Sequence, residues 1–89
     1  MRTVWKYQFF DHRQVGDGPR FTPDIPYDAQ FLRVAMQDGR ITLWFCVDTS
    51  HDHETRTFFF TGTGEDVPDY SNYLGSVTDG PFEWHVWEC

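Results

Sequence analysis

The chain has 89 residues, with 14 acidic and 7 basic side chains and an aromatic fraction of 19%. A chain of this length forms a single domain over residues 1–89 with one small core, because it buries only about two-thirds of its unfolded surface. The length excludes large cofactor folds and barrels of eight helices and strands. The net charge of −7 argues against a general nucleic-acid-binding protein, since such proteins use a basic surface to displace counterions from phosphates.

The charge is unevenly distributed along the chain. Residues 1–40 contain six basic and five acidic side chains, whereas residues 41–89 contain Arg56 and nine acidic side chains. The acidic second half has two interpretations. It is either a solubilising surface or an acidic face that is offered to a basic partner or mimics a nucleic acid.

The sequence also bears on compartment and cysteine chemistry. No stretch approaches the roughly 18–20 apolar residues of a membrane helix, and the N-terminal residues lack the apolar region of a signal peptide. We therefore expect a cytoplasmic protein that makes no membrane contact. Cys46 and Cys89 form no Cys-x-x-Cys pair, so neither a disulfide framework nor a zinc site is indicated. We expect Cys46 to be a buried small hydrophobe and Cys89 to be a free thiol.

The first predicted element is a strand over residues 3–9. Its residues alternate, with Val4, Lys6 and Gln8 on one side and Trp5, Tyr7 and Phe9 on the other. Residues 11–28 contain three prolines and two glycines, which predicts a loop.

A β-hairpin is predicted over residues 31–47, with its turn at Asp38-Gly39. This dipeptide tolerates the positive φ angles of a type I′ turn, whose twist matches that of the flanking strands. A two-residue loop sets apolar pairs on one face: Met36 with Ile41, Val34 with Leu43 and Leu32 with Phe45. The other face pairs Ala35 with Thr42, Arg33 with Trp44 and Phe31 with Cys46.

Three further strands follow, over residues 55–61, 73–78 and 82–87. Gly62-Thr63-Gly64 ends the first of them, a turn at 79–81 joins the last two, and residues 65–72 have room for one helical turn at most. The fold class is therefore all-β or mostly β. Six strands in sequence predict a compact antiparallel sandwich or a rolled meander.

The loop at 48–54 is the strongest candidate for metal binding. It places His51 and His53 beside three carboxylates, and a His-x-His pair presents two imidazoles to an ion such as zinc. The signal is weak, because only His12 and His85 remain as further histidine ligands. A polar connection between strands, with a pH-sensitive surface and no bound metal, is the better interpretation.

Nucleophilic catalysis finds little support in this sequence. None of the serines stands in a nucleophile-elbow context, and a core-facing Cys46 cannot reach a substrate. The neighbouring carboxylates Glu65 and Asp66 lie in a loop, where solvent relieves their repulsion. We therefore expect a protein that is not an enzyme and that carries no cofactor.

Two features suit the binding of an anionic, ring-bearing ligand. The Gly62-Thr63-Gly64 turn is able to aim successive backbone N–H groups at a phosphate, although these glycines also have the simpler role of ending a strand. The 17 aromatic residues exceed what one small core needs, and Arg33 beside Trp44 suits stacking on a nucleobase or burial in an interface. We therefore expect a homo-oligomer and take as ligand-binding candidates Arg33, Trp44, Arg56, Thr63 and Trp87.

The order of motifs resembles a family of small phage-encoded proteins labelled only as a domain of unknown function. The motifs that carry this resemblance are Met1-Arg2-Thr3-Val4-Trp5-Lys6-Tyr7, Val34-Ala35-Met36-Gln37-Asp38-Gly39, Leu43-Trp44 with Val47-Asp48, Thr55-Arg56-Thr57-Phe58, Gly62-Thr63-Gly64, Tyr73-Leu74-Gly75-Ser76-Val77 and Trp84-His85-Val86-Trp87-Glu88. The loop at 10–26 is longer and richer in proline than the resemblance leads us to expect, and Cys89 extends past the usual Glu. The resemblance implies a phage origin and supplies no catalytic residues.

A phage origin suggests a factor that counteracts host defence in the bacterial cytoplasm. The first hypothesis is a non-enzymatic binding protein that sequesters a cyclic or related nucleotide messenger, with no direct binding of nucleic acid. The alternative is an acidic inhibitor that presents Asp66, Asp69 and Asp79 to a basic groove of a host nuclease or nucleic-acid sensor. A third reading, a small metal-dependent enzyme, requires His51 and His53 to hold an ion.

Overall fold

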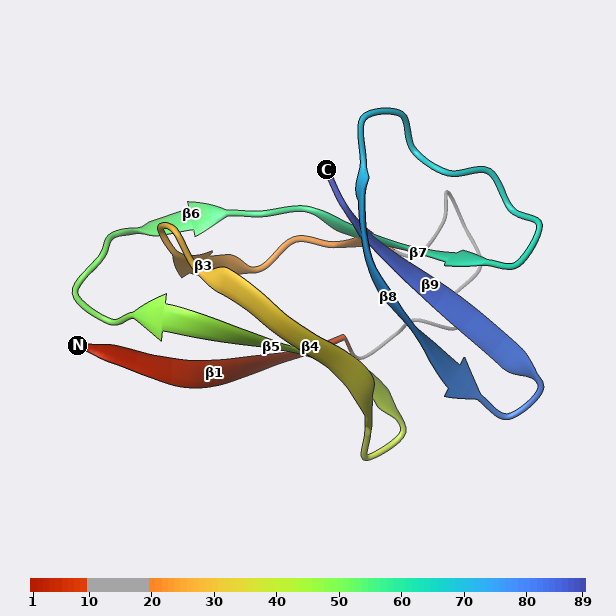
Figure 1. The fold of residues 1–89 in the computed structure, drawn as a ribbon, viewed down its shortest axis with the longest axis horizontal. Helices are drawn as coiled ribbons and strands as arrows, with labels where there is room; N and C mark the ends of the chain where they lie inside the picture. The colour runs from red at the N-terminus through yellow and green to blue at the C-terminus, as the bar shows by residue number, and fades with distance from the viewer. Residues whose placement is uncertain (10–19) are drawn as a thin grey trace.

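A computed structural model describes residues 1–9 and 20–89, and all regular elements in these ranges are β-strands (Figure 1). The three antiparallel sheets have the orders β1-β5-β4, β2-β7-β9-β8 and β3-β6. The strands are β1 Arg2–Phe9, β2 Arg20–Phe21, β3 Asp24–Pro26, β4 Gln30–Gln37, β5 Arg40–Asp48, β6 His53–Thr55, β7 Phe58–Gly62, β8 Asn72–Asp79 and β9 Phe82–Glu88.

The all-β prediction is confirmed, and the described residues form no closed barrel. The predicted number of six strands is wrong, because the described residues form nine. The short strands β2 and β3 lie within the segment that was predicted to be a loop, while residues 11–19 lie outside the described part of the chain. Residues 65–71 form turns and irregular backbone without a helical turn.

The hairpin of β4 and β5 has the predicted turn and, next to it, the predicted register. Asp38 and Gly39 have φ angles of 53° and 74°, as a type I′ turn requires. From the turn the pairs run Gln37↔Arg40, Met36↔Ile41, Ala35↔Thr42, Val34↔Leu43 and Arg33↔Trp44.

Beyond these pairs a β-bulge shifts the register. The predicted pairs Leu32 with Phe45 and Phe31 with Cys46 are wrong, because Phe31 pairs with Phe45 and Gln30 pairs with Cys46. The extra residue is Leu32, which is 46% exposed. The bulge places the larger Phe31 ring against Phe45, with the ring centroids 5.7 Å apart, and turns Leu32 to solvent.

The predicted strand over residues 55–61 is divided in the structure. β6 pairs with β3, and β7 begins after Arg56 and Thr57 and pairs with β2 and β9. At the break the Arg56 N–H donates to the Pro23 carbonyl over 3.1 Å. The chain therefore leaves one sheet and enters another at this point. The run of aromatic and β-branched residues over 55–61 gives no indication of this break.

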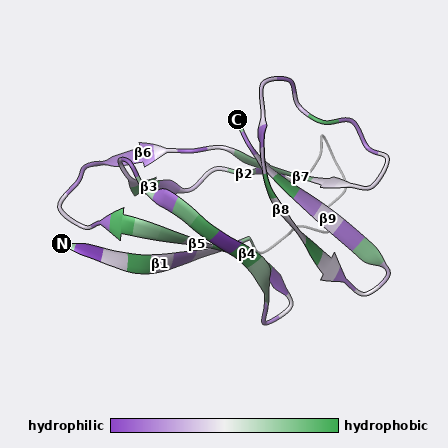
Figure 2. Ribbon diagram, viewed as in Figure 1, coloured by the Kyte–Doolittle hydropathy of each residue, from purple (hydrophilic) through white to green (hydrophobic). Residues whose placement is uncertain are grey.

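The core lies between the three-stranded and the four-stranded sheets. The centroids of Phe45 on β5 and Phe58 on β7 are 5.7 Å apart, and Phe9 stacks on Phe60 at 4.6 Å. Figure 2 shows hydrophilic and hydrophobic bands alternating along β9, as expected for a strand with one face buried. The fully buried core includes Ile25, Ile41, Leu43, Phe45, Val47, Phe58, Phe60 and Val86.

Strand β8 of the four-stranded sheet lies against β4 of the three-stranded sheet. A Cβ atom on Gly75 would lie 2.9 Å from Cγ1 of Val34, and Gly75 has a φ of 152°. At the opposite edge of the three-stranded sheet, β1 pairs with β5 on one side, and no described strand pairs with its other side. No helix in the described ranges is long and apolar enough to cross a membrane.

Candidate functional site

The face of the three-stranded sheet that points away from the core gathers basic side chains around a tryptophan. Arg33 on β4 and Lys6 on β1 are both opposite Trp44 on β5 in the strand register. The Arg33 guanidinium carbon lies 5.3 Å from the centroid of the Trp44 ring, so the predicted cross-strand pair of Arg33 and Trp44 forms a cation–π contact. We call Arg2, Lys6, Arg33 and Trp44 the basic face.

Amide oxygens, rather than carboxylates, position two of these cations. Lys6 Nζ donates to Gln37 Oε1 over 2.6 Å, and Arg2 Nη2 contacts Gln30 Oε1 at 3.4 Å. A neutral acceptor orients a cation without cancelling its charge. Within the described ranges Arg2, Lys6 and Arg33 form no ion pair. They remain available for an anion.

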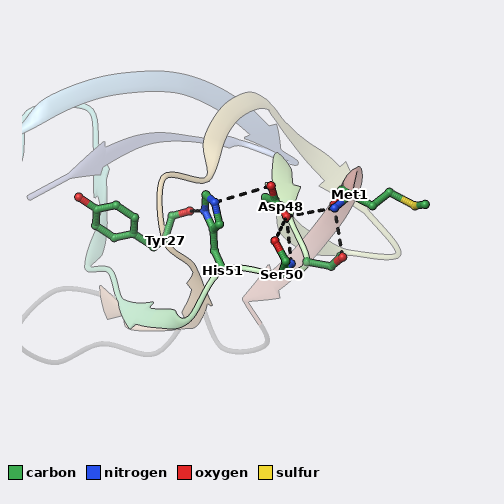
Figure 3. Close-up of polar contacts among 6 residues, drawn as sticks. Met1, Tyr27, Asp48, Ser50 and His51 are labelled. Atoms are coloured by element: carbon green, nitrogen blue, oxygen red, sulfur yellow. Dashed lines mark hydrogen bonds and ion pairs between the residues drawn. The ribbon is translucent and has the colours of Figure 1, made fainter.

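Asp48 is the last residue of β5 and lies on the same side of the sheet as Arg2. Hydrogen-bond donors of neighbouring residues surround its carboxylate (Figure 3). The Ser50 hydroxyl donates to Asp48 Oδ1 over 2.6 Å, the Ser50 N–H over 3.0 Å and the amino group of Met1 over 3.2 Å. The Ser50 hydrogen bonds, with the amino group of Met1, hold the pKa of Asp48 well below its usual range. Its carboxylate is thus ionised and locally compensated.

His51 lies next to this cluster, and both nitrogens of its ring contact groups of the protein. Its Nδ1 lies 2.8 Å from the Tyr27 carbonyl oxygen, which only accepts, and its Nε2 lies 3.6 Å from Asp48 Oδ2 (Figure 3). His53 is on β6, with its ring 6.4 Å from that of Trp5. In the described part of the chain, no three His, Cys, Asp or Glu side chains are grouped so that they could hold a metal ion.

Arg56 has a structural position between the sheets. Its Nε donates to Glu88 Oε2 over 2.6 Å, its Nη2 to Glu88 Oε1 over 2.7 Å and its Nη1 to the Ala29 carbonyl over 2.6 Å. The guanidinium carbon also lies 5.2 Å from the centroid of Phe45 and 5.8 Å from that of Phe58. The planar guanidinium of Arg56 therefore directs these donors to acceptors of the protein itself.

Thr63 and Trp87 lie together on the outward face of the four-stranded sheet. His85 joins them to Tyr73, with Thr63 Oγ1 at 3.1 Å from its Nε2 and the Tyr73 hydroxyl at 3.1 Å from its Nδ1. Trp87 packs edge-on against Tyr73, with centroids 4.8 Å apart, and its Nε1 donates to Thr61 over 2.9 Å. This polar and aromatic network contains no basic residue other than His85.

The carboxylate of Glu65 lies beside the Gly62-Thr63-Gly64 turn. The Glu65 N–H donates to the Gly62 carbonyl over 3.2 Å and closes the turn, with Gly64 at a φ of 91°. Glu65 Oε1 lies 2.8 Å from the position that a Cβ on Gly62 would occupy. A negative charge at this distance disfavours a phosphate beside the turn.

The five predicted ligand residues therefore occupy three places. Arg33 and Trp44 share the basic face, Arg56 lies between the sheets, and Thr63 and Trp87 share the outward face of the four-stranded sheet. The candidates that sequence reasoning missed are Arg2 and Lys6 on the basic face and Tyr73 and His85 on the other. The alternation of residues 3–9 places Lys6 on one side of a predicted strand, but it does not show which strand pairs with that segment.

Cys46 also differs from expectation. It lies on the same outward face as Trp44, opposite Val4 in the register, and is half-buried as a free thiol. On β1, desolvation by burial raises the pKa of the Tyr7 hydroxyl.

Comparison with known proteins identifies a family. The chain belongs to the family described as Domain of unknown function (DUF7352), whose model matches residues 1–89. No curated protein and no solved structure matches the chain.

Proposed function

We propose that this member of a family of unknown function is a non-enzymatic binding protein whose basic face holds a phosphorylated, ring-bearing ligand, that is, a nucleotide. The observation that carries the proposal is the position of Lys6 and Arg33 on either side of Trp44, with Arg2 farther along the same face, in a protein of net charge −7. Here glutamines position two of them and a tryptophan ring a third.

The face supplies both kinds of contact that a nucleotide needs. The Arg33 guanidinium lies over the Trp44 ring, and both are flat groups on which a base stacks. Lys6 and Arg2 follow along β1 and supply charge-assisted donors to phosphate oxygens. Asp48, at the end of this face, is compensated by Ser50 and the amino group of Met1, which limits its repulsion of an anion.

An open sheet face covers only one side of a small ligand. We propose that a second copy of the chain covers the other side, so that the functional form is a homo-oligomer. The resemblance to small phage-encoded proteins supports a role in the host cytoplasm, where capture of a nucleotide messenger would blunt a defence response. The ligand class rests on the basic face, and the biological role rests on the resemblance.

Binding is tested with purified protein and a panel of cyclic mononucleotides, cyclic dinucleotides and linear mononucleotides, by thermal shift and calorimetry. Arg33→Ala and Lys6→Ala each remove one cation of the face and are expected to weaken binding roughly tenfold, as loss of a charge-assisted hydrogen bond does. Arg20→Ala is the matched control, because it removes one exposed cation from β2 in the other sheet. It is expected to leave the affinity unchanged.

Two results would refute this function. One is the absence of a thermal shift with every nucleotide of the panel, and the other is an equal loss of affinity in Arg20→Ala and Arg33→Ala. The natural ligand is sought separately by mass spectrometry of the small molecules released from protein purified out of infected, defence-positive cells. A nucleotide in that fraction, and its loss in Arg33→Ala, would support the proposal.

A second candidate function is favoured by the loop between β7 and β8. Tyr70 in this loop is fully exposed at a φ of 59°, and it stands among the acids Glu65, Asp66 and Asp69. An exposed aromatic ring in an acidic loop suits insertion into a basic groove of a protein partner. This inhibitor function predicts binding that weakens sharply with salt and that charge reversal at Asp66 and Asp69 abolishes.

A further inference from the structure

Residues 65–70, in the connection between β7 and β8, present both carboxylates and apolar side chains to solvent, and we call them the acidic loop. Its exposed acids are Glu65, Asp66 and Asp69. Val67 is 44% exposed, and Tyr70 is fully exposed at a φ of 59°. This left-handed conformation is uncommon for a residue with a large side chain. A strained residue that holds an aromatic ring in water points to a contact outside the fold.

Hydrogen bonds near both ends fix the shape of the acidic loop. The Glu65 N–H donates to the Gly62 carbonyl over 3.2 Å, and the Ser71 hydroxyl donates to the Pro68 carbonyl over 2.6 Å. A loop that is already ordered loses less conformational entropy when it binds. Figure 1 places this loop and β1 on opposite sides of the molecule. The acidic loop therefore does not reach the part of the basic face that β1 contributes in its own chain.

The basic face complements the acidic loop in charge and in apolar groups. Val4 is 55% exposed and lies between Arg2 and Lys6 on the same side of β1. Val4 and Trp44 are thus bordered by cations, just as Val67 and Tyr70 are bordered by carboxylates. Opposite charges steer two such surfaces together, and burial of the apolar side chains stabilises the contact.

We propose that, when no nucleotide is bound, the acidic loop of one copy of the chain docks on the basic face of a second copy, with the Tyr70 ring against Trp44. Asp66 and Asp69 then face the cations of the basic face. This inference rests on the proposed function, because it names a second occupant of the same face. The loop offers a ring with carboxylates where the nucleotide offers a base with phosphates.

The proposed contact joins two different surfaces of the chain. It is therefore heterologous, and its repetition links further copies into a ring or an open chain. A nucleotide that binds the basic face displaces the acidic loop. The contact is distinct from the cover that a second copy provides over a bound nucleotide.

The first test follows association of the full chain from low to high protein concentration by sedimentation velocity and NMR. The expected chemical-shift changes are confined to residues 2–6, 33, 44 and 65–70, and added salt reduces them, because it screens exposed charges. A nucleotide that binds is expected to return the signals of 65–70 to their positions in dilute protein.

Charge reversal of each surface provides the second test. Asp66→Lys with Asp69→Lys reverses the loop, and Lys6→Glu with Arg33→Glu reverses the face. Each double variant alone is expected to associate more than about tenfold more weakly than the parent, because like charges then meet. An equimolar mixture of the two is expected to associate again, because each loop then finds a face of opposite charge.

Two further variants separate the loop from the general acidity of the chain. Asp52→Lys with Glu83→Lys is the matched control, since it makes the same change in net charge at exposed acids outside the loop. It is expected to associate at least as tightly as the parent. Tyr70→Asn removes the ring and keeps a residue that tolerates a positive φ, and it is expected to weaken association about tenfold.

The outcomes distinguish this contact from the proposed function. A parent that stays monomeric at every concentration, an equal loss in the control and the loop variant, or a mixture that does not associate would overturn the contact. Nucleotide binding without association would refute the contact alone. Association that the mixture restores, in a protein that binds no nucleotide, would refute the proposed function alone.

Discussion

Arg56 bridges the two large sheets, and its three hydrogen bonds to Glu88 and Ala29 make it the most constrained cation of the described chain. Its side chain is 16% exposed and that of Glu88 is 19% exposed. Removal of one partner leaves the other charge partly desolvated, a situation that costs about 3–5 kcal/mol when burial is complete. The remaining exposure lowers this range.

We therefore expect Arg56→Met to lower the free energy of unfolding by about 2–4 kcal/mol. The double variant Arg56→Met with Glu88→Leu is expected to recover part of that loss, because no charge is then left without a partner. Urea denaturation of the single and double variants measures both effects. Additive losses in the double variant would contradict the assignment of this pair to the fold.

Asp48 gives a prediction about acid stability. Its pKa is lower in the folded protein than in the unfolded chain, chiefly through the Ser50 hydroxyl. A carboxyl of this kind stabilises the fold above its unfolded pKa of about 3.9, and the stabilisation is lost as the pH falls from there toward the folded pKa. Asp48→Asn should therefore be less stable than the parent at pH 6.

The stability difference between the parent and Asp48→Asn should shrink steadily below about pH 4. Urea unfolding at intervals from pH 6 to pH 2 measures it, and the subtraction removes the titration of the other acids to the extent that the sites are independent. A difference that stays constant over this interval would show that the Ser50 contacts do not act through the charge of Asp48.

At the scale of elements, Gly75 is the residue on which the contact of β8 with β4 depends. A Cβ there would lie 2.9 Å from Val34 Cγ1, at a φ of 152°. Gly75→Ala is expected to destabilise the protein by about 1–3 kcal/mol through this overlap and the backbone strain. Val34→Ala in the same chain makes room for the new methyl group, so the two changes together should cost less than the sum of each alone, as measured by thermal unfolding.

Elements could be predicted from the sequence where neighbouring residues specify them. They were predicted less well where packing between distant residues decides the structure. Asp38-Gly39 carries its turn chemistry in two residues, and the hairpin register beside it was predicted correctly. The bulge at Leu32 places Phe31, rather than Leu32, against Phe45 in the core. The residues next to Leu32 in the sequence do not indicate this choice. The break at Arg56 likewise depends on Glu88, which is 32 residues away.

The candidate site shows the same limit. Arg33 and Trp44 belong to one hairpin, and their contact followed from its register. Lys6 and Arg2 join them because β1 pairs with β5, a contact between distant segments that alternation alone does not specify. Arg56 is a predicted ligand-binding residue together with Thr63, but the three-dimensional structure directs its donors to Glu88 and Ala29 instead.

At the scale of the whole molecule, one core serves both large sheets. Phe45 of one sheet packs on Phe58 of the other, so neither sheet keeps its buried face if the other unfolds. We expect a single cooperative transition in which far-ultraviolet circular dichroism and Trp fluorescence coincide, since Trp44 and Trp87 report on different sheets. Transitions that separate by probe would show that the sheets unfold independently.

The free side of β1 has a consequence for exchange of amide hydrogens. Along an edge strand only alternate N–H groups point toward the neighbouring strand, so protection in β1 should alternate between slow and fast residues, whereas β5 should be protected throughout. If a second chain adds to this edge, the fast amides of β1 are the ones that slow down. Deuterium uptake along Arg2–Phe9 at low and high protein concentration thus reveals association through this strand without any substitution.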